Sequence, residues 1–228
     1  MTRSLLALGL ALSLSAFAGG ARAERVALDR AVVRFSAPET GGARTPRFVF
    51  ERTLAFEARL EALVDPDRVA ARDGRAYRER HVRSALERHV AETLLASLRI
   101  DPEPTARELA RQTDAARRML YERAGGPLAV EQAASAEGID SRELTSILRR
   151  QARSSLYLDR MVAPMLAPSD AELRNIHRSA QTPFRDLRFE EVETALRRWY
   201  VGKRLALALT AFFQNARSRV AITILPPP

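Results

Sequence analysis

The 228-residue sequence contains no cysteine, and this excludes disulfide bonds, thiol catalysis and cysteine-ligated metal sites. Only three histidines are present, and His81 and His89 lie two helical turns apart, whereas metal-binding pairs on a helix sit one turn apart. The H-E-x-x-H, P-loop, G-x-S-x-G and G-x-G-x-x-G motifs are also missing. We therefore expect an ordinary hydrophobic core, no metal, no cofactor and no enzymatic activity. The histidines and the helix glutamates are expected at the surface or at interfaces.

Lysine is nearly absent as well, because Lys203 is the only lysine among 37 basic residues. The formal net charge is +9, which could attract nucleic acid, anionic lipid or acidic protein segments. Arginine and glutamate alternate along the predicted helices, however, and this indicates a mixed, solvated surface. Aromatic RNA-binding motifs and zinc-finger spacing are missing. We expect no nucleic-acid partner and at most peripheral contact with a membrane.

The first 23 residues have the pattern of a secretory signal peptide. Arg3 precedes an apolar run from Leu5 to Ala18, and small residues around Ala21 and Ala23 form a cleavage site. The apolar run is shorter than the roughly 20 residues of a transmembrane helix. The mature protein is predicted to begin at Glu24 and to be exported as a soluble chain.

The mature sequence is predicted to be mainly α-helical, with β-segments at its two ends. Apolar runs on both sides of Asp29-Arg30 predict two short strands, ending near Phe35, and residues 36–46 read as a loop. Thr105, Asp140 and Ser169 each precede a glutamate three residues later, which predicts helix N-termini. The apolar periodicity and these caps predict helices over residues 48–64, 77–98, 105–123, 127–137, 140–163, 169–179 and 189–217.

The last β-forming segment, Val220–Leu225, must pair with something, because a lone strand leaves its backbone groups unsatisfied. The economical partner is the segment around residues 26–35. We therefore predict a multi-helix fold with a small β-element that joins the two termini. Residues 24–64 and 185–228 would meet there, and residues 76–180 would form the helical middle.

The order of these segments resembles that of SurA-type periplasmic chaperones. The matching stretches are 26–33 for the N-terminal strand, 137–151 for the middle helices, 167–173 for the P-S-D-A-E-L helix start, and 212–225 for the final helix and strand. The resemblance implies a trigger-factor-like chaperone core in the periplasm. Its job would be ATP-independent binding of unfolded exported proteins, including outer-membrane β-barrel proteins, in an apolar cradle between helices.

One difference from that family concerns catalysis. The full-length family carries parvulin-type prolyl isomerase domains between the P-S-D-A-E-L helix and the final helix, where this chain has only residues 178–187. Ten residues are too few for a domain. The resemblance therefore implies a chaperone core without isomerase activity, and a proline isomerisation assay on a short peptide is expected to give the uncatalysed rate.

Flexible methionines and aromatic rings suit a surface that adapts to different clients. The candidate peptide-binding residues are Met119, Tyr121, Tyr157, Met161 and Met165. A helical adaptor that binds one specific protein partner, or the anionic membrane surface, is the alternative function that the sequence leaves open.

Overall fold

The computed structural model describes residues 29–66, 76–179 and 182–226. The predicted signal peptide, residues 1–23, and the first predicted strand, residues 26–28, lie outside the described residues. None of the described helices combines the length and the apolar character that a bilayer crossing requires.

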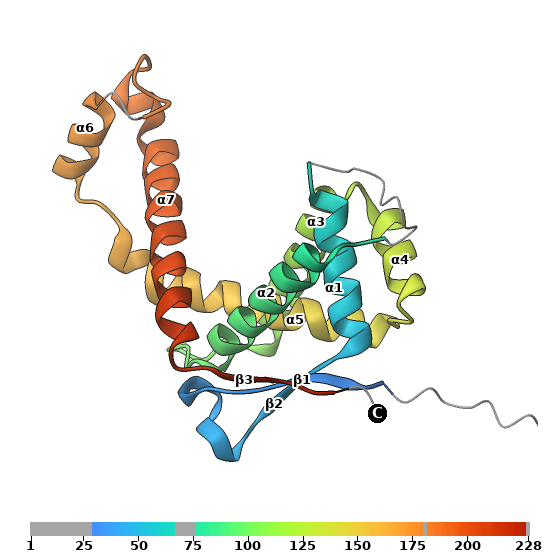
Figure 1. Ribbon diagram of the computed structural model, residues 1–228. Helices are drawn as coiled ribbons and strands as arrows, with labels where there is room; N and C mark the ends of the chain where they lie inside the picture. Colours follow the sequence, from blue (N-terminus) through green and yellow to red (C-terminus); the bar gives the residue numbers. More distant parts are fainter. Residues whose placement is uncertain (1–28, 67–75, 180–181, 227–228) are drawn as a thin grey trace, which may run out of the picture.

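The described chain is mainly α-helical with one small sheet (Figure 1). The strands are β1 (Ala31–Ser36), β2 (Arg47–Phe50) and β3 (Ala221–Ile224). The helices are α1 (Glu51–Val64), α2 (Glu79–Ser97), α3 (Ala106–Ala124), α4 (Pro127–Ala136), α5 (Ser141–Tyr157), α6 (Asp170–Arg178) and α7 (Phe189–Arg217). Two short 3-10 turns, Pro38–Thr40 and Gly42–Arg44, occupy the predicted loop between β1 and β2.

The sheet confirms the predicted pairing of the C-terminal strand with the N-terminal region. Its order is β2-β1-β3 and both pairings are antiparallel. Val33 lies opposite Ile224, and Phe35 lies opposite Ile222. The last helix therefore returns to the start of the fold, and the backbone groups of β3 that face β1 are satisfied.

Strand β2 corrects the prediction that a helix begins at residue 48. Arg47-Phe-Val-Phe50 alternates, with Val49 fully buried and both phenylalanines exposed, which is the period of a strand with one buried face. Val49 lies opposite Val33 of β1. Helix α1 starts only at Glu51, whose N–H donates to Arg30 O at 2.8 Å. Pairing with β1 outweighs the helical spacing of the apolar residues.

The predicted helix caps are confirmed. The Thr105 hydroxyl accepts from Glu108 N–H at 3.2 Å, and the Glu108 carboxylate accepts from Thr105 N–H at 2.9 Å, a complete capping box. Asp140 and Ser169 cap α5 and α6 in the same position. Gly125, at φ 90°, ends α3 in the left-handed conformation that glycine adopts without steric cost.

Helix α5 ends earlier than predicted. The regular helix stops at Tyr157, a π-helical turn covers Leu158–Val162, and a 3-10 turn covers Ala163–Leu166. Pro164 lies in the first turn of this last segment, where its missing N–H leaves no hydrogen bond unmade.

Three apolar clusters hold the described body together. The first joins α1, α3, α4 and α5 and centres on Phe56, Val130 and Leu148. The second packs the inner face of the sheet, with Phe35 and Val49, on α1, α2 and the end of α7. The third is small and contains Ile100, Leu109, Ala152 and Leu156.

Helix α7 leaves this body and runs from the sheet toward α6, which lies beside its far end (Figure 1). At that end Val192 and Leu196 are buried, Tyr200 Oη donates to Glu172 Oε1 at 2.9 Å, and Arg197 pairs with Asp170 at 2.7 Å. The predicted apolar stripe of α7 is only partly correct, because Ala206 is exposed. Toward the C-terminal end of α7, the apolar residues Leu209 and Phe213 are half-buried.

Candidate functional site

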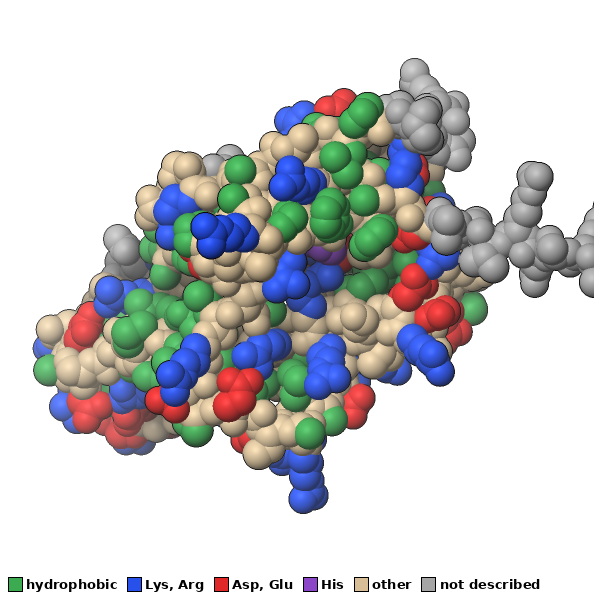
Figure 2. All heavy atoms as spheres, turned by 90° about the horizontal axis from the view of Figure 1, so that it is seen from below, with side chains coloured by type: hydrophobic (Ala, Val, Ile, Leu, Met, Phe, Trp, Pro, Cys, Tyr) green, Lys and Arg blue, Asp and Glu red, His purple; other side chains and the backbone are tan. Residues whose placement is uncertain are grey.

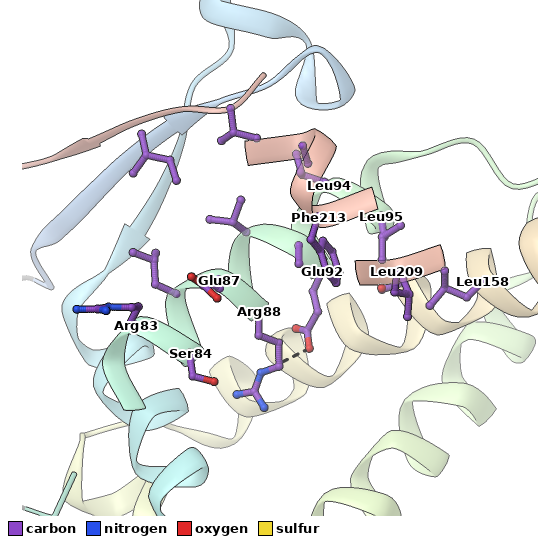
Figure 3. A pocket seen from close by; sticks show the side chains of 17 residues that line it. Arg83, Ser84, Glu87, Arg88, Glu92, Leu94, Leu95, Leu158, Leu209 and Phe213 are labelled. Carbon is purple, nitrogen blue, oxygen red and sulfur yellow. Dashed lines mark ion pairs between the residues drawn. The ribbon is translucent and has the colours of Figure 1, made fainter. Parts of the chain in front are cut away.

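An apolar pocket of about 660 Å³ lies between α2, α5, α7 and β3 (Figure 3). Aliphatic and aromatic side chains from four elements make up most of its lining: Leu86, Val90, Ala91, Leu94 and Leu95 of α2, Leu158 beyond α5, Leu209, Phe213 and Ala216 of α7, and Val220 and Ile222 at the C-terminal strand. The volume lies within the range of pockets that receive ligands or side-chain groups.

The path of the chain explains why this space is not filled. The pairing of β3 with β1 brings the end of α7 onto α2, where Ala216 and Phe212 join the core beside Val90. Further from the sheet α7 diverges from the helical body (Figure 1). Leu209 and Phe213 are therefore only half-buried, and their apolar surface lines a half-open pocket and not a closed core.

The polar part of the lining comes from α2 and α5: Arg83, Ser84, Glu87, Arg88 and Glu92 of α2, and Ser154 of α5. Arg88, Glu92 and Ser154 also line a second, smaller depression of about 230 Å³, which borders α3. Figure 3 shows Arg88 and Glu92 pointing toward each other, with Arg88 Nε and Glu92 Oε1 3.9 Å apart. A thin layer of charged side chains thus separates the two depressions.

These charges belong to a buried cluster between α1, α2 and α5. Glu57 is only 1% exposed, and His89 Nδ1 lies 3.1 Å from its Oε2 atom. Arg150 of α5 pairs with Glu57 and reaches Glu92 Oε2 at 3.4 Å. Arg88 Nη1 lies 2.6 Å from an oxygen of Glu61, which adds a third carboxylate.

Burial raises the pKa values of Glu57 and Glu92, whereas the neighbouring positive charges lower them. Burial favours the neutral form of Glu57, but His89, Arg150 and Arg88 together lower its pKa below the ordinary value. Burial raises the pKa of Glu92 to about 7, because Arg150 and Arg88 offset desolvation only in part and Glu57 adds repulsion. Near neutral pH the cluster therefore contains one carboxylate held ionised and one that readily takes a proton.

This arrangement supports a structural role for the cluster. Within the described ranges 29–66, 76–179 and 182–226, no group of three or more histidine or acidic side chains could hold a metal ion. The Glu57–His89 pair is buried and ties α1 to α2, while Arg150 ties both to α5. The prediction that the helix glutamates lie at the surface is wrong for Glu57, and His89, expected at the surface or at an interface, is buried between α1 and α2. Ion pairing in the interior accounts for this, since a buried charge must be matched.

The five predicted peptide-binding residues do not meet at the 660 Å³ pocket, and none of them lines it. Met119 is exposed and borders the smaller depression. Tyr121 packs against the first apolar cluster, and Tyr157 and Met161 pack against the third. Met165 is exposed on the 3-10 turn after α5.

Sequence reasoning missed the pocket because its residues had been assigned to core stripes. Leu86, Val90 and Leu94 recur every four residues in α2, and Leu209 and Phe213 belong to the stripe of α7. Such spacing predicts a buried helix face but does not tell whether a second element covers it fully. A usable signal was present for Glu57, which stands between Phe56 and Ala58 of α1, but not for His89, which follows Glu87 and Arg88 in α2.

Charged side chains on the surface are mixed. Figure 2 shows the molecule from below, with arginine and lysine side chains spread among hydrophobic and acidic ones. This view agrees with the alternation of arginine and glutamate along the sequence.

No family model, no curated protein and no solved structure matches this chain.

Proposed function

We propose that the mature chain is an ATP-independent periplasmic chaperone that binds unfolded exported proteins, outer-membrane β-barrel proteins among them. The single observation that supports this most is the half-open apolar pocket between α2, α5, α7 and β3. The predicted export signal and the order of the segments, which resembles that of SurA-type chaperones, support the same function.

The physical basis is non-directional burial of apolar surface. Removing apolar area from water contributes about 25 cal/mol per Å², whatever the sequence that supplies it. The pocket offers this surface on four separate elements, with Leu209 and Phe213 on the diverging helix α7. Val90, Leu94 and Ala216 of the second apolar cluster form one wall of the pocket, and the first cluster, around Leu148 and Phe56, lies apart from it.

Exposed apolar side chains lie outside the pocket as well. Leu207 on α7 is 66% exposed, and Met119, Leu128 and Met165 are exposed on the helical body. Scattered exposed apolar residues are ordinary for a soluble protein. We therefore assign client binding to the pocket, where apolar side chains from four elements converge, and not to these single residues.

The test is suppression of aggregation of a urea-unfolded β-barrel membrane protein by the purified chain that starts at Glu24. We expect light scattering to fall at a several-fold molar excess of this chain, without ATP. Leu209→Gln places an amide in the apolar lining and should weaken suppression by about tenfold or more, since an unpaired polar group costs about 1–3 kcal/mol.

Leu207→Gln is the matched control, because Leu207 lies two positions away on the same helix and does not line the pocket. It should suppress aggregation as well as the unmodified chain. No suppression by the unmodified chain at several-fold excess would refute the proposal. Tight, saturable binding of a single folded protein with no effect on unfolded chains would favour the adaptor function.

A further inference from the structure

Strand β3 has one edge that no described residue pairs with. Leu225 N–H donates to Val32 O at 2.9 Å, so Leu225 points its backbone groups toward β1. Backbone groups alternate between the two edges of a strand, and Thr223 and Ala221 therefore also face β1. Ile222 and Ile224 consequently direct their N–H and C=O groups away from the sheet, where the described part of the chain places no partner strand.

The side chains of the same two residues lie next to the apolar pocket. Ile222 lines the pocket and is 49% exposed, and Ile224, two residues later on the same face, is 77% exposed. They lie opposite Phe35 and Val33, whose side chains are buried in the core. Because Ile222 lines the pocket, the free backbone edge and the pocket are adjacent, and alternate side chains of a strand added here would lie over the pocket.

We propose that an extended client segment adds to β3 as a fourth, edge strand and places alternate apolar side chains over the pocket. This inference rests on the proposed chaperone function and specifies the conformation of the bound client. The added strand would form backbone hydrogen bonds with the outer edge of β3, as β1 already does with its inner edge. Main-chain hydrogen bonds supply recognition without a required sequence, which suits a chain that binds many clients.

The two edges of the sheet differ in a way that supports this assignment. Natural edge strands are protected by charges, prolines or bulges. The β2 side has Arg47 on its strand. Strand β3 reads Ala-Ile-Thr-Ile, and no charge or proline occurs from Ala221 to Leu225, the residue before Pro226; over this stretch its edge is the one open to strand addition.

The charges on the three strands predict which client segments bind more tightly. The three strands contain Arg34 and Arg47 and no aspartate or glutamate. Arg34 lies opposite Thr223 on the outer face, two strands from the added one. That separation is about 10 Å, beyond the Debye length of about 8 Å at physiological salt but well within the roughly 30 Å at 0.01 M. At low salt, segments that alternate apolar with acidic residues should therefore bind better than those that alternate apolar with basic residues.

The test uses a short peptide that alternates valine with glutamate, and amide hydrogen exchange of the chain from Glu24 followed by NMR. Saturating peptide should slow exchange at Ile222 and Ile224 by about tenfold or more, while Thr223, already bonded to β1, should change little. The matching peptide with lysine in place of glutamate should bind more weakly at low salt.

Two substitutions of Ile224 distinguish the contribution of its backbone N–H to peptide binding from that of its side chain. Ile224→Pro removes the outward N–H and leaves the bonds to β1 in place, and Ile224→Ala keeps that N–H and removes only the side chain. The proline variant should bind the peptide about fivefold more weakly than the alanine variant, the effect of one hydrogen bond. Circular dichroism must show that both variants fold.

The outcomes distinguish this inference from the chaperone function. If aggregation is suppressed but the Ile222 and Ile224 amides stay unprotected, strand addition is refuted and the chaperone function stands. Protected amides in a chain that does not suppress aggregation would refute the chaperone function alone. A concentration-dependent dimer, detected by light scattering, that protects these amides without peptide would overturn the proposal by assigning the edge to a second copy. Tighter binding of the lysine peptide would overturn the assigned client chemistry.

Discussion

The buried carboxyl of Glu92 makes the stability of this protein depend on pH in the neutral range. Burial raises the pKa of Glu92 from its ordinary value of 4.5 to about 7. The folded state therefore binds a proton that the unfolded chain releases between these two values. The stability linked to Glu92 is fully present below pH 4.5 and is lost as the pH rises through 7.

The size of the effect follows from the change in pKa. Each unit corresponds to about 1.4 kcal/mol, so the loss between pH 4.5 and pH 8 is about 3 kcal/mol. Glu92→Gln imitates the protonated group at every pH. We expect the variant to match the unmodified chain below about pH 4.5, and to exceed its free energy of unfolding by about 3 kcal/mol at pH 8.

Glu57→Gln, in the same cluster, should lower the free energy of unfolding, whereas Glu92→Gln raises it. Its lowered pKa means that the carboxylate stabilises the fold above pH 4.5 and that this contribution disappears as the pH falls through its folded value. Removing one partner of a buried ion pair costs about 3–5 kcal/mol, because Arg150 loses its counter-charge and His89 loses a hydrogen-bond partner. The variant should therefore be clearly less stable than the unmodified chain at pH 7.

Urea unfolding of the chain from Glu24, followed by circular dichroism at several pH values from 4 to 8, measures both effects. Coincident fluorescence and circular dichroism transitions must first establish two-state behaviour. The difference in free energy of unfolding between a variant and the unmodified chain removes the contribution of the other carboxyl groups, which titrate in both. A constant difference between Glu92→Gln and the unmodified chain over this range would refute the reasoning, as would the same sign for both variants.

Two further predictions concern the helical body. Leu148→Ala should lower the free energy of unfolding by about 2–5 kcal/mol in urea titrations, because Leu148 is fully buried among α1, α3, α4 and α5; a loss below 1 kcal/mol would contradict this packing. Thr105→Ala should cost about 1 kcal/mol through loss of the α3 capping box, while Thr105→Ser keeps the hydroxyl and should stay near the unmodified chain in the same titration.

The positions of most helices could be predicted from the sequence because their signals are local. Thr105, Asp140 and Ser169 each bond a backbone N–H two or three residues ahead, and Gly125 ends a helix by its own backbone freedom. The pairing of Val220–Leu225 with the N-terminal region was also predictable. An unsatisfied strand needs a partner, and the strand-forming segment near Phe35 supplied one.

Strand β2 shows where local signals fail. The apolar residues after Pro46 fit both a helix and a strand, and the choice was made by contact with β1, more than ten residues earlier in the chain. The end of α5 was misjudged for a similar reason. The apolar spacing continues to Met161, but the backbone already changes to a π-helical turn after Tyr157.

The candidate site was decided by tertiary structure alone. The sequence by itself determined that α2 and α7 carry apolar stripes, since periodicity depends only on residue order. It could not determine that these stripes diverge and leave a pocket at Leu209 and Phe213, because the angle between two helices depends on where the chain is tied down. Here the tie is the β1–β3 ladder. In the same way, Glu57, His89 and Arg150 come from three helices, and only packing brings their charges together away from water.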